Sequence, residues 1–96
     1  PYAVGDNGLI LRAGAEGWEK VHEEPGLFLY GVHAFGNQVV AVGWAGRIIN
    51  YDADTDKVEQ VEAPDSGVLL QVWGPDAGHV FVVGKKGKML RFEADE

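Results

Sequence analysis

The sequence predicts an all-β fold built from a repeated unit of short strands. Three glycine-containing segments can be superimposed: AVGDNGLILR from Ala3, AVGWAGRIIN from Ala41 and VVGKKGKMLR from Val82, which start 38 and 41 residues apart. Between them, LYGVHAFGNQVV from Leu29 aligns with LLQVWGPDAGHVF from Leu69, with one extra residue in the later copy. No segment shows the 3.6-residue apolar period of an amphipathic helix. Three glycine pairs that agree together with their apolar neighbours indicate an internal repeat rather than chance.

Each unit contains four short apolar segments separated by Gly, Asp, Asn or Pro, which is typical of strands joined by tight turns. In the complete unit these segments are residues 29–35, 38–43, 47–52 and 57–62. Four strands in about 40 residues is the period of one β-propeller blade. If the strands of a blade are lettered a to d outward from the axis, the chain runs b-c-d, a-b-c-d and a-b-c, so we expect ten strands.

These strands divide the chain into about two and a half four-stranded blades: a partial blade (1–26), a complete blade (27–66) and a second partial blade (67–96). The b strands are the most uniformly apolar, as VVAVG and VFVVG show, so we expect neighbouring blades to cover both of their faces. Trp18 and Trp73 fall on expected strands, and we expect them to pack between blades.

The repeat resembles the blades of propellers similar to the photosystem II stability/assembly factor, which are related to the BNR (Asp-box) repeats of sialidases. The pattern Val/Ala-Val-Gly-x-x-Gly-x-Ile-Leu-Arg followed by LYGV or LLQVWG carries this resemblance over nearly the whole chain. An Asp-box itself reads Ser/Thr-x-Asp-x-Gly-x-x-Trp, and here only Gly17 and Trp18 agree with it. Because no box is intact and no arginine cluster is recognisable, we expect no sialidase chemistry, no cofactor and no enzyme.

A propeller needs at least four blades to close, and this chain supplies fewer. Two explanations stay open. The chain is a fragment of a longer propeller, or it is a self-assembling unit whose copies join head to tail as a homo-oligomer. Two chains of three partial blades each would form a dimer with a six-bladed ring.

Composition excludes several classes of partner. The net charge of −7 argues against nucleic acid and against anionic membrane surfaces, both of which attract clustered Lys and Arg. No run approaches the roughly 20 apolar residues of a membrane span, so no membrane insertion is expected. The absence of cysteine excludes disulfides and thiolate metal sites, but it does not indicate a cellular compartment.

The segment VVGKKGKML, residues 82–90, resembles a phosphate-binding loop only at first sight. A GxxxxGK[ST] loop needs four residues between its glycines, a hydroxyl after the lysine and a helix that follows. Here two residues separate the glycines, and the equivalent turns GDNG and GWAG contain no lysine. The pattern predicts two-residue hairpin turns, in which Gly and Asn tolerate positive φ.

The segment DADTD provides a weak calcium candidate at Asp52, Asp54 and Asp56. Oxygen ligands at alternate positions begin calcium loops, but Lys57 stands where such a loop needs glycine and Gln60 replaces its last Asp. The alternative is a solvated hairpin turn, in which Asp side chains accept backbone N–H bonds.

Trp44 is the most informative aromatic residue, because a hairpin turn needs no large apolar side chain. On a propeller the b–c and d–a turns emerge on the same side, here called the turn rim. We expect the rim to gather Asp6, Asn7, Glu24, Trp44, Asp65, Lys85 and Lys86. An exposed Trp among mixed charges is typical of interfaces, so the sequence favours a binding or scaffold module with a protein partner. A lectin-like, carbohydrate-binding propeller is the alternative.

Overall fold

The structure is a computed structural model that describes residues 2–62, 67–76, 78–85 and 89–92. These residues form ten strands in three antiparallel sheets, which confirms the all-β prediction. Among the described residues there is no helix with the length and hydrophobicity to span a membrane.

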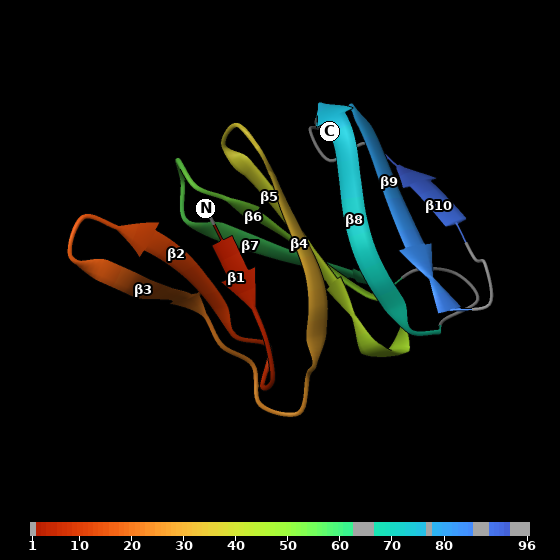
Figure 1. The fold of residues 1–96 in the computed structure, drawn as a ribbon, viewed down its shortest axis with the longest axis horizontal. Helices are drawn as coiled ribbons and strands as arrows, with labels where there is room; N and C mark the ends of the chain where they lie inside the picture. Colours follow the sequence, from red (N-terminus) through yellow and green to blue (C-terminus); the bar gives the residue numbers. More distant parts are fainter. Residues whose placement is uncertain (1, 63–66, 77, 86–88, 93–96) are drawn as a thin grey trace.

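The three sheets follow the chain in order (Figure 1). The first sheet contains β1 (Tyr2–Val4), β2 (Ile10–Gly14) and β3 (Gly17–His22). The middle sheet contains β4 (Leu29–Phe35), β5 (Gln38–Gly43), β6 (Arg47–Asp52) and β7 (Lys57–Glu62). The third sheet contains β8 (Leu69–Asp76), β9 (His79–Gly84) and β10 (Met89–Phe92). Each strand pairs with the next one in its sheet, so all connections within a sheet are hairpins.

The core has two parts because the middle sheet is covered on both faces. Val40 and Val42 of β5 pack with Leu69, Val80 and Val82 of the third sheet, whereas Ala41 packs with Leu29 and with Ile10 of the first sheet. Ile48 and Ile49 of β6 divide between the two parts in the same way. Side chains alternate between faces along a strand, so a continuous apolar run is what burial of both faces requires.

The outer faces of the first and third sheets have no such cover in the described structure. Trp18 on β3 and Trp73 on β8 are 57% and 52% exposed, so the expectation that they pack between sheets is wrong. Trp18 lies on the edge strand of the first sheet, and Trp73 stacks on Phe81 of its own sheet at 5.0 Å between ring centroids. In the described part of the chain, neither Trp has a second sheet to bury it.

Two of the three glycine pairs form the expected two-residue hairpin turns. Asn7 and Gly8 have φ of 62° and 61°, and Ala45 and Gly46 have φ of 58° and 71°. The turns are closed by hydrogen bonds from Leu9 N–H to the Asp6 carbonyl and from Arg47 N–H to the Trp44 carbonyl. Two consecutive left-handed residues define a type I′ turn, whose twist matches that of the strands it joins. The third turn lies outside the described residues.

The first strands of the middle and third sheets, β4 and β8, pair with their neighbours in the same register. Leu29 is paired with Gly43, and Leu69 is paired with Gly84, and each strand bulges within its next two residues. The later copy has a second register shift between Trp73 and Asp76, which absorbs its one extra residue.

Candidate functional site

A cleft lies between the β3–β4 connection, which follows the first sheet, and the β5–β6 turn of the middle sheet. Its volume is about 150 Å³, and it is lined by Glu24, Pro25, Gly26, Leu27, Trp44, Ala45 and Arg47. The lining comes from two chain segments, the β3–β4 connection and the 3-10 turn η1 (Trp44–Gly46) with the residue that follows it.

Backbone hydrogen bonds hold the β3–β4 connection against the β1–β2 turn. Glu24 N–H donates to the Asn7 carbonyl at 2.7 Å, and Gly8 N–H donates to the Leu27 carbonyl at 2.6 Å. A side chain at Gly8 would also approach the Glu24 carbonyl oxygen to 2.9 Å, and the φ of 61° favours glycine there. The turn therefore fixes the wall of the cleft that carries Glu24 and Leu27.

Trp44 is held at the opposite wall. Its N–H donates to the Phe28 carbonyl at 2.9 Å, and the two rings meet edge to face at 6.5 Å between centroids. The Trp44 side chain nevertheless remains 51% exposed. An aromatic residue with a fixed backbone and an open ring face can contact a partner at a low entropic cost.

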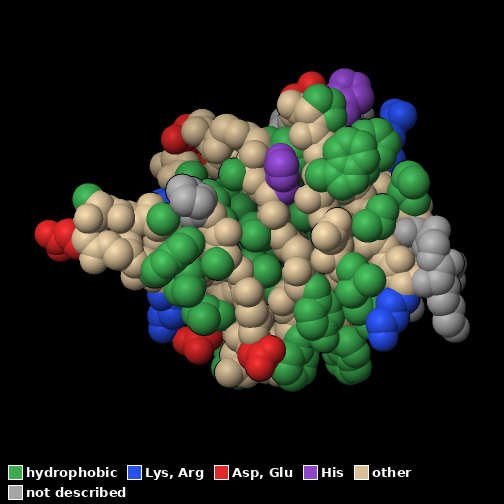
Figure 2. Space-filling model, in the orientation of Figure 1, with side chains coloured by type: hydrophobic (Ala, Val, Ile, Leu, Met, Phe, Trp, Pro, Cys, Tyr) green, Lys and Arg blue, Asp and Glu red, His purple; other side chains and the backbone are tan. Residues whose placement is uncertain are grey.

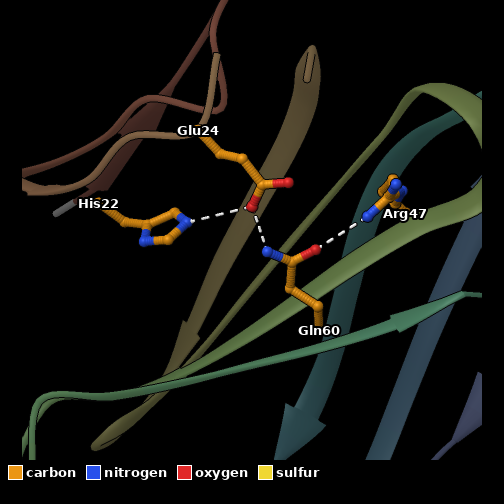
Figure 3. Close-up of polar contacts among 4 residues, drawn as sticks. All are labelled: His22, Glu24, Arg47 and Gln60. Atoms are coloured by element: carbon orange, nitrogen blue, oxygen red, sulfur yellow. Dashed lines mark hydrogen bonds and ion pairs between the residues drawn. The ribbon is translucent and has the colours of Figure 1, made fainter. Parts of the chain in front are cut away.

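A polar network joins the β3–β4 connection to the middle sheet, and it includes two residues that line the cleft (Figure 3). The Gln60 amide nitrogen donates to a carboxylate oxygen of Glu24, and Arg47 Nη1 donates to the Gln60 amide oxygen at 2.9 Å. The network thus runs from the β3–β4 connection through β7 to the start of β6. Both ends of the Gln60 amide are used, so its orientation is determined by its partners.

His22 lies at the edge of this network. Its Nε2 is 3.7 Å from Oε1 of Glu24, which is longer than a hydrogen bond. The atom is buried and has no hydrogen-bond partner in the described structure.

The structure brings together four of the residues expected on the turn rim. Glu24 and Trp44 line the cleft, and Asp6 and Asn7 lie in the turn that supports it. Lys85 occupies the place of Trp44 in the third sheet, since its N–H donates to the Val68 carbonyl at 3.1 Å. Asp65 and Lys86 lie outside the described residues.

Sequence reasoning missed Arg47, Gln60 and His22 as members of the site. Arg47 directly follows the second glycine of its pair, where the other copies have Leu9 and Lys88. Because this position varies between the copies, the repeat pattern did not point to Arg47. Gln60 carries no local signal, because only its long-range contact with the β3–β4 connection places it near Glu24. His22 lies two residues before Glu24 at the end of β3, but its residue type alone did not identify it as a member of the site.

The three Asp residues of the β6–β7 turn accept hydrogen bonds from the protein itself. Asp52 accepts from the N–H of Asp54 at 2.9 Å, and Asp54 accepts from the Asn37 side chain. Tyr51 donates its hydroxyl to Asp56 at 2.5 Å, and this bond, together with burial, raises the pKa of Tyr51. The described residues contain no group of three His, Cys, Asp or Glu side chains arranged to hold a metal ion. The contacts are those of a hydrogen-bonded hairpin turn.

Comparison of the chain with protein-family models, with curated proteins and with solved structures finds no match in any of the three.

Proposed function

We propose that the chain is a non-catalytic binding module of β-propeller architecture and that it engages a protein partner through the cleft at Trp44. The propeller is supported by the repeat, by the three successive antiparallel sheets and by the contact between β4 and β8, the first strands of neighbouring sheets. A propeller would gather its d–a and b–c connections on one side. Here such connections contact each other twice, through the hydrogen bond from Gly8 to Leu27 and through the one from Gly46 to Gly67.

The half-exposed Trp44 ring is the observation that carries the binding proposal. It stands beside Leu27 and Pro25, with the Arg47–Gln60–Glu24 network next to it. Binding energy at protein interfaces is concentrated in aromatic and arginine side chains of this kind, surrounded by polar groups. The net charge of −7 favours a partner with a basic surface around its contact residue.

The size of the cleft favours a protein partner over a carbohydrate. About 150 Å³ is well below the roughly 300–1,000 Å³ of ordinary small-molecule sites, and it suits one inserted apolar side chain. A lectin-like site would need free amide groups for sugar hydroxyls, but both ends of the Gln60 amide are already bonded within the chain.

The uncovered faces of the two outer sheets support the proposal that further sheets flank them. Copies of the chain joined head to tail, or the rest of a longer propeller, would supply these sheets. Trp18, Trp73 and Met89 are each more than half exposed on these sheets. Large exposed apolar groups mark surfaces that bind other proteins. Light scattering that gave the mass of a single folded chain at all concentrations would refute assembly from copies.

The binding proposal is tested by selecting a displayed peptide library on the immobilised chain. Peptides enriched on the wild type should bind at least about tenfold more weakly to Trp44→Ala, which is the effect of losing an interface hot spot of ~1.4 kcal/mol or more. Trp18→Ala is the matched control, since it removes a similarly exposed Trp on β3, outside the lining of the cleft. Equal binding by the wild type and Trp44→Ala would contradict the proposal, and selective signals on a glycan array would favour the lectin-like alternative.

A further inference from the structure

In two of the three glycine pairs, the first strand of the same sheet explains why the first residue of the pair is a glycine. A Cβ on Gly43 would overlap the carbonyl oxygen of Phe28, directly before β4. A Cβ on Gly84 would lie 2.6 Å from the carbonyl oxygen of Val68, directly before β8. Neither glycine has a left-handed φ, so close approach of the neighbouring strand is what excludes a side chain at these positions.

Gly5 holds the same place in the repeat, but this chain gives no reason for a glycine there. Nothing lies within 4 Å of a Cβ built on Gly5, and its φ is not left-handed. Trp44 and Lys85 donate their N–H groups to the carbonyl before the first strand, and no corresponding bond from Asp6 is found in the described part of the chain. The first sheet therefore keeps the glycine but lacks the strand that would need it.

The free edge of β1 is the place where that strand would lie. The first sheet begins at β1, so one edge of this strand has no partner among the described residues. β1 contacts the first strand of the next sheet, β4, in the same way that β5 contacts β8. The difference is that β5 also has β4 paired along its own edge, whereas β1 has no such strand in the described structure. Tyr2, Ala3 and Val4 are only half-buried, whereas residues 40–42 at the same places in β5 are 0% exposed.

We propose that the free edge of β1 accepts an extended segment from outside the described structure, which pairs antiparallel to β1 and completes a four-stranded sheet. The segment carries the Leu-x-x-Val pattern of β4 and β8, with its Leu opposite Gly5 and its Val opposite Ala3. Addition of a strand to a free sheet edge is an established mode of peptide recognition. This inference is independent of the Trp44 cleft.

The pattern follows from what the first strands of the other two sheets bury. Leu29 and Leu69 are 3% and 0% exposed, and Val72 is 5% exposed. Both strands bulge just after the Leu. The occupant is a separate segment rather than β4 or β8 of a second copy, because those strands are already paired with β5 and β9 and their Leu side chains are buried.

Apolar side chains are also exposed on β4, the strand that contacts β1, and on β8 next to it. Figure 2 shows the face on which β4 and β8 lie, where apolar side chains gather and most Lys, Arg, Asp and Glu side chains are at the margin. Tyr30 and Leu70 are exposed on these two strands.

The proposal is tested with a fluorescent, lysine-tagged peptide of residues 27–36, titrated into the full chain. We expect saturable binding, together with protection of the amides of β1 from hydrogen exchange. A peptide in which Asp replaces the residues corresponding to Leu29 and Val32 should not bind. Gly5→Ala should weaken binding at least tenfold with an unchanged melting temperature, because the Cβ has space in the free chain but would overlap the bound strand.

Gly67→Ala is the matched control, since Gly67 also has open space for a Cβ and no left-handed φ. It should change neither binding nor the melting temperature. Failure of the wild type to bind the peptide, or equal binding by Gly5→Ala, would overturn the proposal. So would a wild-type dimer that Gly5→Ala converts to a monomer without any peptide binding, because that result would assign the edge to a second copy.

A covalent version of the experiment uses stability as its readout. Residues 29–38 are fused directly before residue 1, which recreates the hairpin that leads into β5. The fusion should raise the melting temperature by at least about 5 °C, and Gly5→Ala should remove that gain. A fusion with the same melting temperature as the parent chain would count against the strand site.

Discussion

Strands β5 and β1 occupy the same place in the repeat, but β5 is buried and β1 is half exposed. Val40, Ala41 and Val42 are 0% exposed because β4 and β6 pair with β5 while the first and third sheets cover its faces. β1 has only β2 as a pairing partner. Similar sequences thus acquire different burial from their neighbours, and stability should be concentrated in the middle sheet.

The largest difference between the two strands is expected at their glycines. Gly43→Ala should lower the free energy of unfolding by about 3 kcal/mol or more, because its Cβ overlaps the Phe28 carbonyl and β4 must shift. Gly5→Ala should change it by less than about 0.5 kcal/mol. Urea unfolding of both variants measures the difference, and similar losses would mean that the two sites are equally crowded.

The next effect is the loss of apolar contacts at the two corresponding valines. Val42→Ala should cost about 2 kcal/mol, because Val42 is fully buried and the change leaves a cavity. Val4→Ala should cost less than about 1 kcal/mol, since Val4 is only half-buried. Chemical denaturation of each variant checks this order, and a larger loss at Val4 would reverse the comparison.

The hairpin turns after the two strands differ in backbone strain. Ala45 has φ of 58°, a conformation that disfavours a Cβ, so Ala45→Gly should stabilise the chain by about 0.5 to 1 kcal/mol. Asn7→Gly should change stability by only a few tenths of a kcal/mol, because Asn tolerates this conformation. The thermal midpoints of the two variants test this, and destabilisation by Ala45→Gly would contradict a left-handed Ala45.

The smallest effect is a pH dependence that Tyr51 of the middle sheet contributes. The hydrogen bond to Asp56, followed by burial, raises the pKa of Tyr51 above that of the unfolded chain. The resulting stability is fully present below the unfolded value of about 10 and is lost as pH rises through the folded pKa. Tyr51→Phe should therefore flatten the decline of the melting temperature in this alkaline range. The first sheet has Ala13 at the corresponding place and cannot contribute this term.

Much of the fold could be predicted because turn and strand chemistry is local. The glycine pairs indicated the hairpins, and the extra residue after Leu69 corresponds to the additional bulge between Trp73 and Asp76. The burial of Trp18 and Trp73 was predicted wrongly, because an amphipathic strand does not reveal whether another sheet covers it. Trp44 was identified from its position in a turn, but the placement of Gln60 near Glu24 depends on contact between the middle sheet and the β3–β4 connection.

The sequence by itself determined the all-β class and the hairpin turns at the first two glycine pairs, because these depend on glycine conformations and on side-chain alternation within a few residues. Only the tertiary structure decided which copies of the repeat are crowded. Gly5, Gly43 and Gly84 hold the same place in the aligned segments. A Cβ on Gly43 or Gly84 would meet the neighbouring strand, whereas a Cβ on Gly5 would have open space. Packing depends on which elements are present beside a residue, and a local pattern cannot specify that.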